Sequence, residues 1–178
     1  MAIREPSVEG VGTTTPIVFG RRLAGSELFK GLFREGMALV EETATYLDSE
    51  GRKDSRRLSR AGSLAYATES MRLTTRLMQL ASWLLLQRAV NDGEMSAEQA
   101  GIERQKVKLN GFSSTTEGPG WDDMPACLRD LIVRSLRLQE RVRRLDGAME
   151  QADLAGAVEN PFVREFGRVA RAFGAVRE

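Results

Sequence analysis

Histidine does not occur in this chain of 178 residues, and cysteine occurs once, at Cys127. Without histidine the chain cannot form a Ser-His-Asp or Cys-His catalytic group, or a metal site that uses imidazole ligands. A single cysteine also excludes an intrachain disulfide and a zinc site built from several thiolates. We therefore expect no catalytic residue, no cofactor and no metal, and we interpret Cys127 as a small buried apolar residue rather than a nucleophile.

Long apolar segments are missing as well. The longest strongly apolar run, Leu80–Leu86, is far shorter than the roughly 20 residues that a membrane-spanning helix needs. Residues 1–25 hold no apolar core of signal-peptide length. From these two absences we predict a cytoplasmic protein that does not enter a membrane.

The chain also lacks a strong net charge of either sign. The chain has 26 Lys and Arg against 25 Asp and Glu, a formal net charge of +1, whereas nucleic-acid-binding domains usually carry a clear basic excess. One run is locally basic, RKDSRRLSR, and its arginines form a candidate charged face: Arg52, Arg56, Arg57 and Arg60. We favour internal ion pairs or a protein partner for this run, and we keep a helical nucleic-acid-binding regulator as the alternative function.

What the chain does contain is helical periodicity, because apolar residues recur at spacings of three and four in its central part. We predict an all-α fold, an antiparallel three-helix bundle with a short extra helix and flexible N- and C-terminal tails. The predicted parts are a tail at 1–25, a bundle at 26–151 with helices at about 26–48, 55–91, 96–109 and 123–151, and a tail at 152–178 with a short amphipathic segment.

The long second helix has two apolar stripes. One consists of Leu64, Thr68, Met71, Thr75, Met78, Ser82, Leu85 and Ala89, and the other of Leu73, Leu77, Leu80 and Leu84. We interpret the stripes as adjacent and expect neighbouring helices to cover both, which would make this helix the central member of the bundle. Its basic flank also predicts an electrostatic attraction to the acidic first helix.

The last predicted helix repeats its apolar residues at heptad spacing. The repeat consists of Leu128, Leu131, Ser135, Leu138, Val142, Leu145 and Met149. This spacing is typical of a seam inside a bundle or of a short coiled coil. Since two exposed seams could pair, we predict a homodimer.

The C-terminal tail contains a second candidate site. Phe162, Phe166, Val169 and Phe173 share one helical face, and Arg164, Arg168 and Arg171 lie away from it. Such a segment can pack on its own bundle or dock in a groove of another protein, and we favour docking on a partner. It is short and carries only three arginines, so binding to anionic lipid would be weak.

Two stretches of the chain resemble a known family. Ser63–Ser96 (SLAYATESMRLTTRLMQLASWLLLQRAVNDGEMS) and Ala38–Arg60 (ALVEETATYLDSEGRKDSRRLSR) are similar to the regulator of CtrA degradation, the RcdA family of alphaproteobacteria. The resemblance extends from about Phe19 to about Met149.

This resemblance implies a helical-bundle adaptor for regulated proteolysis, and it carries over no catalytic residue. The implied partners are the ClpXP protease primed by a CpdR-like response regulator, a PopA-like effector that binds cyclic di-GMP, and CtrA and other cargo proteins. It also implies that the protein gathers at a cell pole. On the residues alone, we assign cargo or effector binding to the charged faces of the bundle and protease docking to the tail.

Overall fold

The computed structural model describes residues 27–107, 109, 116 and 120–158, with side chains up to Gln151. These residues form helices and no strand, which confirms the predicted all-α class. The helices are α2 (Glu27–Asp48), α3 (Glu50–Ser55), α4 (Arg60–Asn91), α5 (Ala97–Lys106) and α6 (Ala126–Val158). Helices α2, α4 and α6 pack against one another as the predicted three-helix bundle, and α5 is the short extra helix, which packs on α4. The predicted tail at 1–25 lies outside the described residues.

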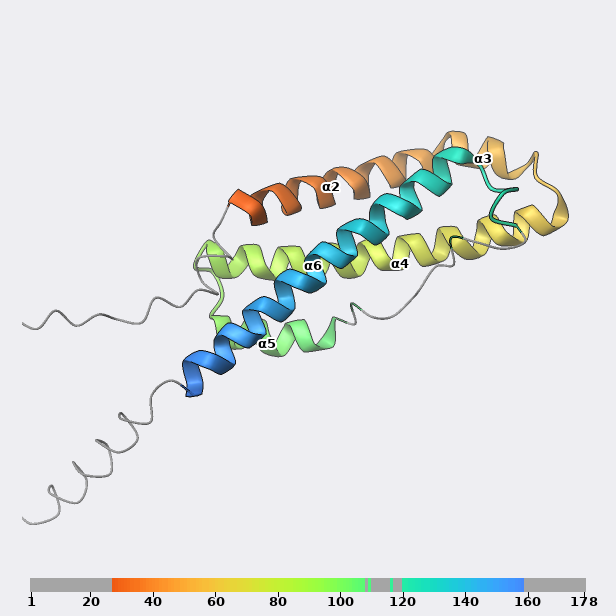
Figure 1. Cartoon of the computed structure of the whole chain (residues 1–178). Coiled ribbons are helices and arrows are strands. Elements are labelled where there is room, and N and C mark those ends of the chain that lie inside the picture. Colours follow the sequence, from red (N-terminus) through yellow and green to blue (C-terminus); the bar gives the residue numbers. More distant parts are fainter. Residues whose placement is uncertain (1–26, 108, 110–115, 117–119, 159–178) are drawn as a thin grey trace, which may run out of the picture.

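The three long helices differ in direction. Helix α2 runs antiparallel to α4 and α6, while α4 and α6 run the same way (Figure 1). The buried contacts agree, because Arg76 meets Ser135 and, further along both helices, Trp83 meets Asp146. The expected antiparallel arrangement therefore holds for α2 but not for the pair α4 and α6, since α5 and the segment after it carry the chain back before α6 begins. As a result, the start of α2, the end of α4 and the end of α6 share one end of the bundle (Figure 1).

The core lies between the three long helices, and α6 supplies it with a continuous seam. All seven residues of the predicted heptad repeat on this helix are buried. They face Trp83 and Leu84 of α4 and Leu32 and Leu39 of α2, which belong to the same buried core. The heptad repeat on α6 is therefore the internal seam of the bundle, and its seven residues are not available to a second coiled-coil helix.

Our expectation that both stripes of α4 are covered is wrong for one of them. The stripe of four leucines is buried in the core, whereas the stripe that begins at Leu64 faces solvent. The reason is geometric, since successive helix residues are about 100° apart and the two stripes are offset by two residues. This offset of roughly 200° places them on opposite faces of the helix instead of side by side.

The long helix also begins later than predicted, at Arg60 rather than at residue 55. Ser59 caps it, because its hydroxyl accepts a hydrogen bond from the Gly62 N–H at 3.0 Å. The residues before it form the separate short helix α3. Gly51 lies buried inside α3, where a Cβ atom would lie 2.5 Å from the Tyr66 hydroxyl.

The other helix ends differ in smaller ways. A capping box of Ser96 and Gln99 starts α5 close to the predicted residue 96, but the helix ends at Lys106 and not at residue 109, because Val107 is already extended. Helix α6 begins at Ala126, after Pro125, and continues beyond the predicted end at residue 151 to Val158. Gly147 does not break it, since a glycine in the middle of a helix costs only about 1 kcal/mol. The first residues of the predicted tail at 152–178 are therefore helical.

The attraction expected between the acidic first helix and the basic second helix is found between α2 and α6 instead. The Arg134 guanidinium contacts both carboxylate oxygens of Glu42 at 2.7 and 2.8 Å. Arg141 contacts Glu35 at 2.6 Å. On α4, by contrast, Arg72 pairs with a carboxylate of its own helix at 2.6 Å.

Candidate functional site

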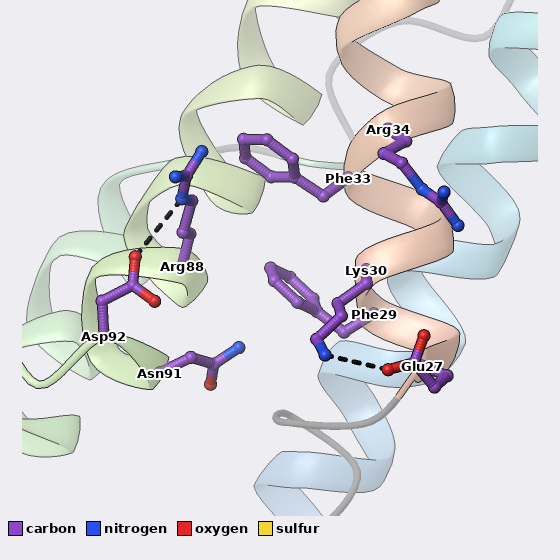
Figure 2. Close-up of a pocket in the computed structure, with 8 residues that line it drawn as sticks. All are labelled: Glu27, Phe29, Lys30, Phe33, Arg34, Arg88, Asn91 and Asp92. Carbon is purple, nitrogen blue, oxygen red and sulfur yellow. Dashed lines mark hydrogen bonds and ion pairs between the residues drawn. The ribbon is translucent and has the colours of Figure 1, made fainter.

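A pocket of about 540 Å³ lies where the start of α2 meets the end of α4 (Figure 2). Its apolar part comes from Phe29 and Phe33, which α2 presents one turn apart toward α4. Their ring centroids lie 6.2 Å apart, with the rings tilted by 43°. Phe29 is buried, whereas Phe33 is partly exposed to the pocket. The pocket therefore offers an aromatic surface at an end of the bundle.

The rim of this pocket is charged, with both signs represented. The Arg88 guanidinium lies 5.0 Å from the centre of the Phe33 ring and forms an ion pair with Asp92 at 3.3 Å. On the α2 side, Lys30 forms an ion pair with Glu27 at 2.8 Å, and its hydrogen bond lowers the pKa of that carboxyl group. An apolar floor inside a charged rim is suited to an apolar side chain that projects from a polar peptide.

The described residues contain no group of three or more His, Cys, Asp or Glu residues arranged to hold a metal ion. The buried cation Arg76 donates to the Ser135 hydroxyl at 2.8 Å, and that hydroxyl donates to the Ile132 carbonyl. Burial lowers the pKa of Arg76. We assign this contact to the alignment of α4 with α6, because it lies inside the packed bundle and not in the pocket.

The four arginines of the predicted charged face lie in α3, in the turn that follows it, and at the first residue of α4. Arg52 pairs with Asp48 at 3.0 Å, so part of its charge is neutralised. Arg56, Arg57 and Arg60 are exposed, and among the described residues they form no ion pair. The structure therefore supports internal pairing for one of the four arginines and leaves three available to a partner. They lie at the opposite end of the bundle from the pocket (Figure 1).

Cys127 is exposed, so our interpretation of it as a buried residue is wrong. It precedes Leu128 on α6, and one residue turns the helix by about 100°, away from the core. The pKa of its thiol is raised, first by partial loss of hydration and then by the carboxylates of Glu42 and Asp130. A thiol held in the protonated form is a poor nucleophile, and the expectation that Cys127 is not a nucleophile stays a prediction.

The candidate residues of the tail, Phe162 to Phe173, lie outside the described residues. Two features were missed by sequence reasoning: the pocket, and the exposed apolar stripe on α4. The sequence contained a signal for the stripe, namely the two-residue offset that places it opposite the leucines. The pocket depends on how the start of α2 is placed against the end of α4. The sequence contains no spacing pattern that predicts this placement.

None of the helices described is both long and apolar enough to cross a bilayer.

Comparisons with known proteins identify a family and a similar solved structure. The family model described as "Protein of unknown function (DUF1465)" matches residues 20–173. The crystal structure of RcdA from Caulobacter crescentus CB15 is 53% identical in sequence and superposes with a TM-score of 0.60, covering 72% of this chain and 96% of that chain. No curated protein matches the sequence.

Proposed function

This chain belongs to the DUF1465 family and to the family of RcdA, and from this premise we propose that it is an adaptor for regulated proteolysis. Such a protein brings cargo to a protease and performs no chemistry itself. The observation that carries the proposal is the 53% identity to RcdA, a regulator of CtrA degradation, over 96% of that chain. The bundle is consistent with this role because its pocket and exposed arginines offer binding surfaces.

We propose that the protease is ClpXP, primed by a CpdR-like response regulator, and that the cargo is CtrA and other regulators. A PopA-like effector that binds cyclic di-GMP is the proposed partner for part of this cargo, and the complex would gather at a cell pole. In this scheme Phe162, Phe166, Val169 and Phe173 dock on the primed protease. The bundle holds the cargo or the effector.

Within the bundle, we assign capture of a cargo segment to the pocket of Phe29 and Phe33. Burial of one large apolar side chain contributes about 1.5–3 kcal/mol, which is enough for reversible capture when the charged rim adds contacts. An adaptor must release its cargo to the protease, and a shallow aromatic site with a polar rim is suited to such an exchange.

A reconstituted degradation reaction tests the function. It contains ClpXP, the CpdR-like and PopA-like proteins, cyclic di-GMP and fluorescent CtrA, with the full chain, no chain, or a chain that lacks 160–178. We expect the full chain to accelerate the loss of CtrA and the truncated chain to fail, with the same thermal unfolding for both. Equal rates with and without the full chain would overturn the function, whereas full activity of the truncated chain would overturn only the role of the tail.

The alternative function, nucleic-acid binding through the basic run, rests on the exposure of Arg56, Arg57 and Arg60. A DNA retardation assay at increasing salt separates it from the adaptor, because contacts to phosphate weaken steeply as salt rises. Retention at low salt that is lost when these three arginines become alanine would support the alternative. We expect no retention.

A further inference from the structure

Arg88, the cation that borders the aromatic pocket on α4, is held in place by two weak contacts. Its guanidinium lies 5.0 Å from the centre of the Phe33 ring, and its Nε donates to Asp92 Oδ2 at 3.3 Å. Both charged side chains are more than half exposed, and an exposed ion pair of this kind contributes less than about 1 kcal/mol. These contacts therefore orient Arg88 but add little to the stability of the bundle.

Most of the hydrogen-bond donors of Arg88 remain open to a ligand. A guanidinium carries N–H groups on each of its nitrogens, and Asp92 accepts only from Nε. No residue that the structure describes accepts from the terminal nitrogens Nη1 and Nη2. Figure 2 shows these two nitrogens directed away from Asp92, beside the Phe33 ring. The Nη1–Nη2 edge of a guanidinium can bind both oxygens of one carboxylate.

The acceptors around the pocket, by contrast, already have donors of their own. Glu27 accepts from Lys30 at 2.8 Å, and Asp92 accepts from the Nε group described above. The side-chain oxygen of Asn91 accepts from Nε2 of the buried Gln87 at 3.1 Å. A ligand that brings acceptors therefore finds open donors here, whereas a ligand that brings donors must compete with contacts inside the protein.

The lining of the pocket also has more positive than negative charge. Its eight residues include the cations Lys30, Arg34 and Arg88 and the carboxylates Glu27 and Asp92, which gives a net charge of +1. Arg34 is exposed and, within the described part of the chain, forms no ion pair. The charge of the pocket therefore favours a negatively charged ligand.

The aromatic rings determine what must stand next to that negative charge. Phe29 and Phe33 provide the apolar surface, and the guanidinium of Arg88 lies at the same distance scale from Phe33 as one step along a peptide chain, 5.0 Å. Neighbouring Cα atoms in a peptide are about 3.8 Å apart. If an apolar side chain of the ligand rests on Phe33, the residue next to it in the chain can therefore bring a carboxylate to Arg88.

We infer that the pocket selects a segment of cargo in which a large apolar side chain is flanked by aspartate or glutamate, and that Arg88 binds the flanking carboxylate. This inference rests on the proposed function, from which the pocket takes its role in cargo capture, and it adds the chemistry of the segment. The segment is internal to the cargo chain, because charged groups border the pocket on both α2 and α4. Polar groups on both sides of the apolar residue therefore find partners.

Peptide binding tests the selectivity. Three short peptides, blocked at both ends, carry one phenylalanine between two glutamates, two glutamines or two lysines. The isotope-labelled full chain is titrated with each, and the amide NMR signals of residues 27–34 and 88–92 report binding at the pocket. We expect the glutamate peptide to bind about tenfold more tightly than the glutamine peptide, and the lysine peptide to bind most weakly. Equal binding of the glutamate and glutamine peptides, a preference for lysine, or no binding of any peptide overturns the inference.

Arg88→Gln tests which residue is responsible. In this variant the glutamate peptide should fall to the affinity of the glutamine peptide, whose own binding should not change, and circular dichroism should match the wild type. Arg137→Gln is the matched control, because Arg137 is an exposed arginine of α6 outside the pocket and has no ion pair among the described residues. It removes the same charge and should keep the tenfold preference. A preference that survives in Arg88→Gln, or that is lost equally in Arg137→Gln, overturns the role of Arg88.

The peptide experiment is separable from the function on which the inference rests. It contains no protease, response regulator or effector, so selectivity that holds while the full chain fails to accelerate the loss of CtrA overturns only the adaptor function. Acceleration together with equal peptide binding overturns only the selectivity. A fourth peptide places the phenylalanine at a free C-terminus and contains no glutamate. Binding as tight as that of the glutamate peptide would overturn the assignment to an internal segment.

Discussion

The indole N–H of Trp83 on α4 donates to the Asp146 carboxylate on α6 at 2.8 Å. Trp83 is completely buried, and Arg104 of α5 approaches the same carboxylate oxygen at 3.7 Å. One side chain of α6 thus connects three helices. Because α4 and α6 are parallel and far apart in sequence, this contact helps to fix how far one helix is shifted along the other.

Replacing Asp146 should therefore destabilise the bundle. Asp146→Ala leaves the Trp83 N–H buried without an acceptor, and we expect the free energy of unfolding to fall by about 1–3 kcal/mol. Asp146→Asn keeps a side-chain oxygen that can accept this hydrogen bond, so its loss should be smaller. Urea denaturation followed by circular dichroism measures both. Equal losses would show that the hydrogen bond is not the cause.

Gly51 and Gly147 should respond in opposite ways to alanine. At Gly51 a Cβ atom would lie 2.5 Å from the Tyr66 hydroxyl and 2.9 Å from the Tyr46 carbonyl oxygen, so α3 would have to move. We expect Gly51→Ala to lower the free energy of unfolding by about 1–3 kcal/mol. A Cβ atom added at Gly147 would have no described atom within 4 Å beyond its chain neighbours and the backbone of its own helix, and Gly147→Ala should raise the free energy of unfolding by up to about 1 kcal/mol. Thermal unfolding of the two variants checks the pair, and a stabilised Gly51→Ala would contradict the packing of α3.

The ion pair of Glu42 and Arg134 should make stability depend on pH in the acid range. The hydrogen bond from Arg134 lowers the pKa of Glu42. The stabilisation by this ion pair is therefore fully present at pH values above the pKa of Glu42 in the unfolded chain, about 4.3. It is lost as the pH falls through the lower pKa that Glu42 has in the folded protein. Since both side chains are nearly half exposed, we expect less than about 1 kcal/mol.

The measurement is the difference in free energy of unfolding between the wild type and Glu42→Gln. It should favour the wild type at pH 7 and be smaller at pH 3. Glu41→Gln is the control, because Glu41 is the exposed neighbour of Glu42 and forms no ion pair among the described residues. A difference for Glu42→Gln that is the same at both pH values would contradict the role of the pair.

Assigning cargo capture to the pocket predicts that a substitution there lowers the affinity for cargo. Phe33→Ala removes much of its aromatic surface, and we expect the affinity for cargo to fall about tenfold, which corresponds to about 1.4 kcal/mol. The variant should also unfold somewhat more easily, because Phe33 packs against the core. Fluorescence anisotropy of labelled CtrA measures the affinity.

Leu47→Ala is the matched control for this prediction. Leu47 is a partly buried apolar residue near the other end of the same helix, so its loss should cost stability but leave the affinity for cargo unchanged. If both variants weakened cargo binding equally, the effect would come from stability and the pocket assignment would fail.

The sequence predicted those features that depend on local spacing. The heptad of α6 identified seven buried residues because six of them are apolar and all seven lie on one helix face. The start of α5 lies within one residue of the prediction, because its capping box, Ser96 and Gln99, is formed within a single turn. The family resemblance was confirmed as well, at 53% identity to RcdA.

Features that depend on the placement of several helices were not predictable in the same way. Helix α4 is apolar on two faces, so its pattern alone could not show which face meets α2 and α6. Cys127 belongs to a residue type that is usually buried, but its position on α6 directs it to solvent. Glu42 of α2 pairs with Arg134 of α6 because α2 packs against α6 as well as against α4. The net charges of the helices alone could not identify which of the two holds its partner.

The parallel course of α4 and α6 has a consequence for where the described helices start and stop. Helix α2 starts, and α6 stops, at the end of the bundle that holds the pocket (Figure 1). A protein bound by residues beyond 158 would therefore be tethered to the end of the bundle that holds the pocket. Such tethering raises the local concentration of one ligand near the site of another, so that two weak attachments act as one strong one.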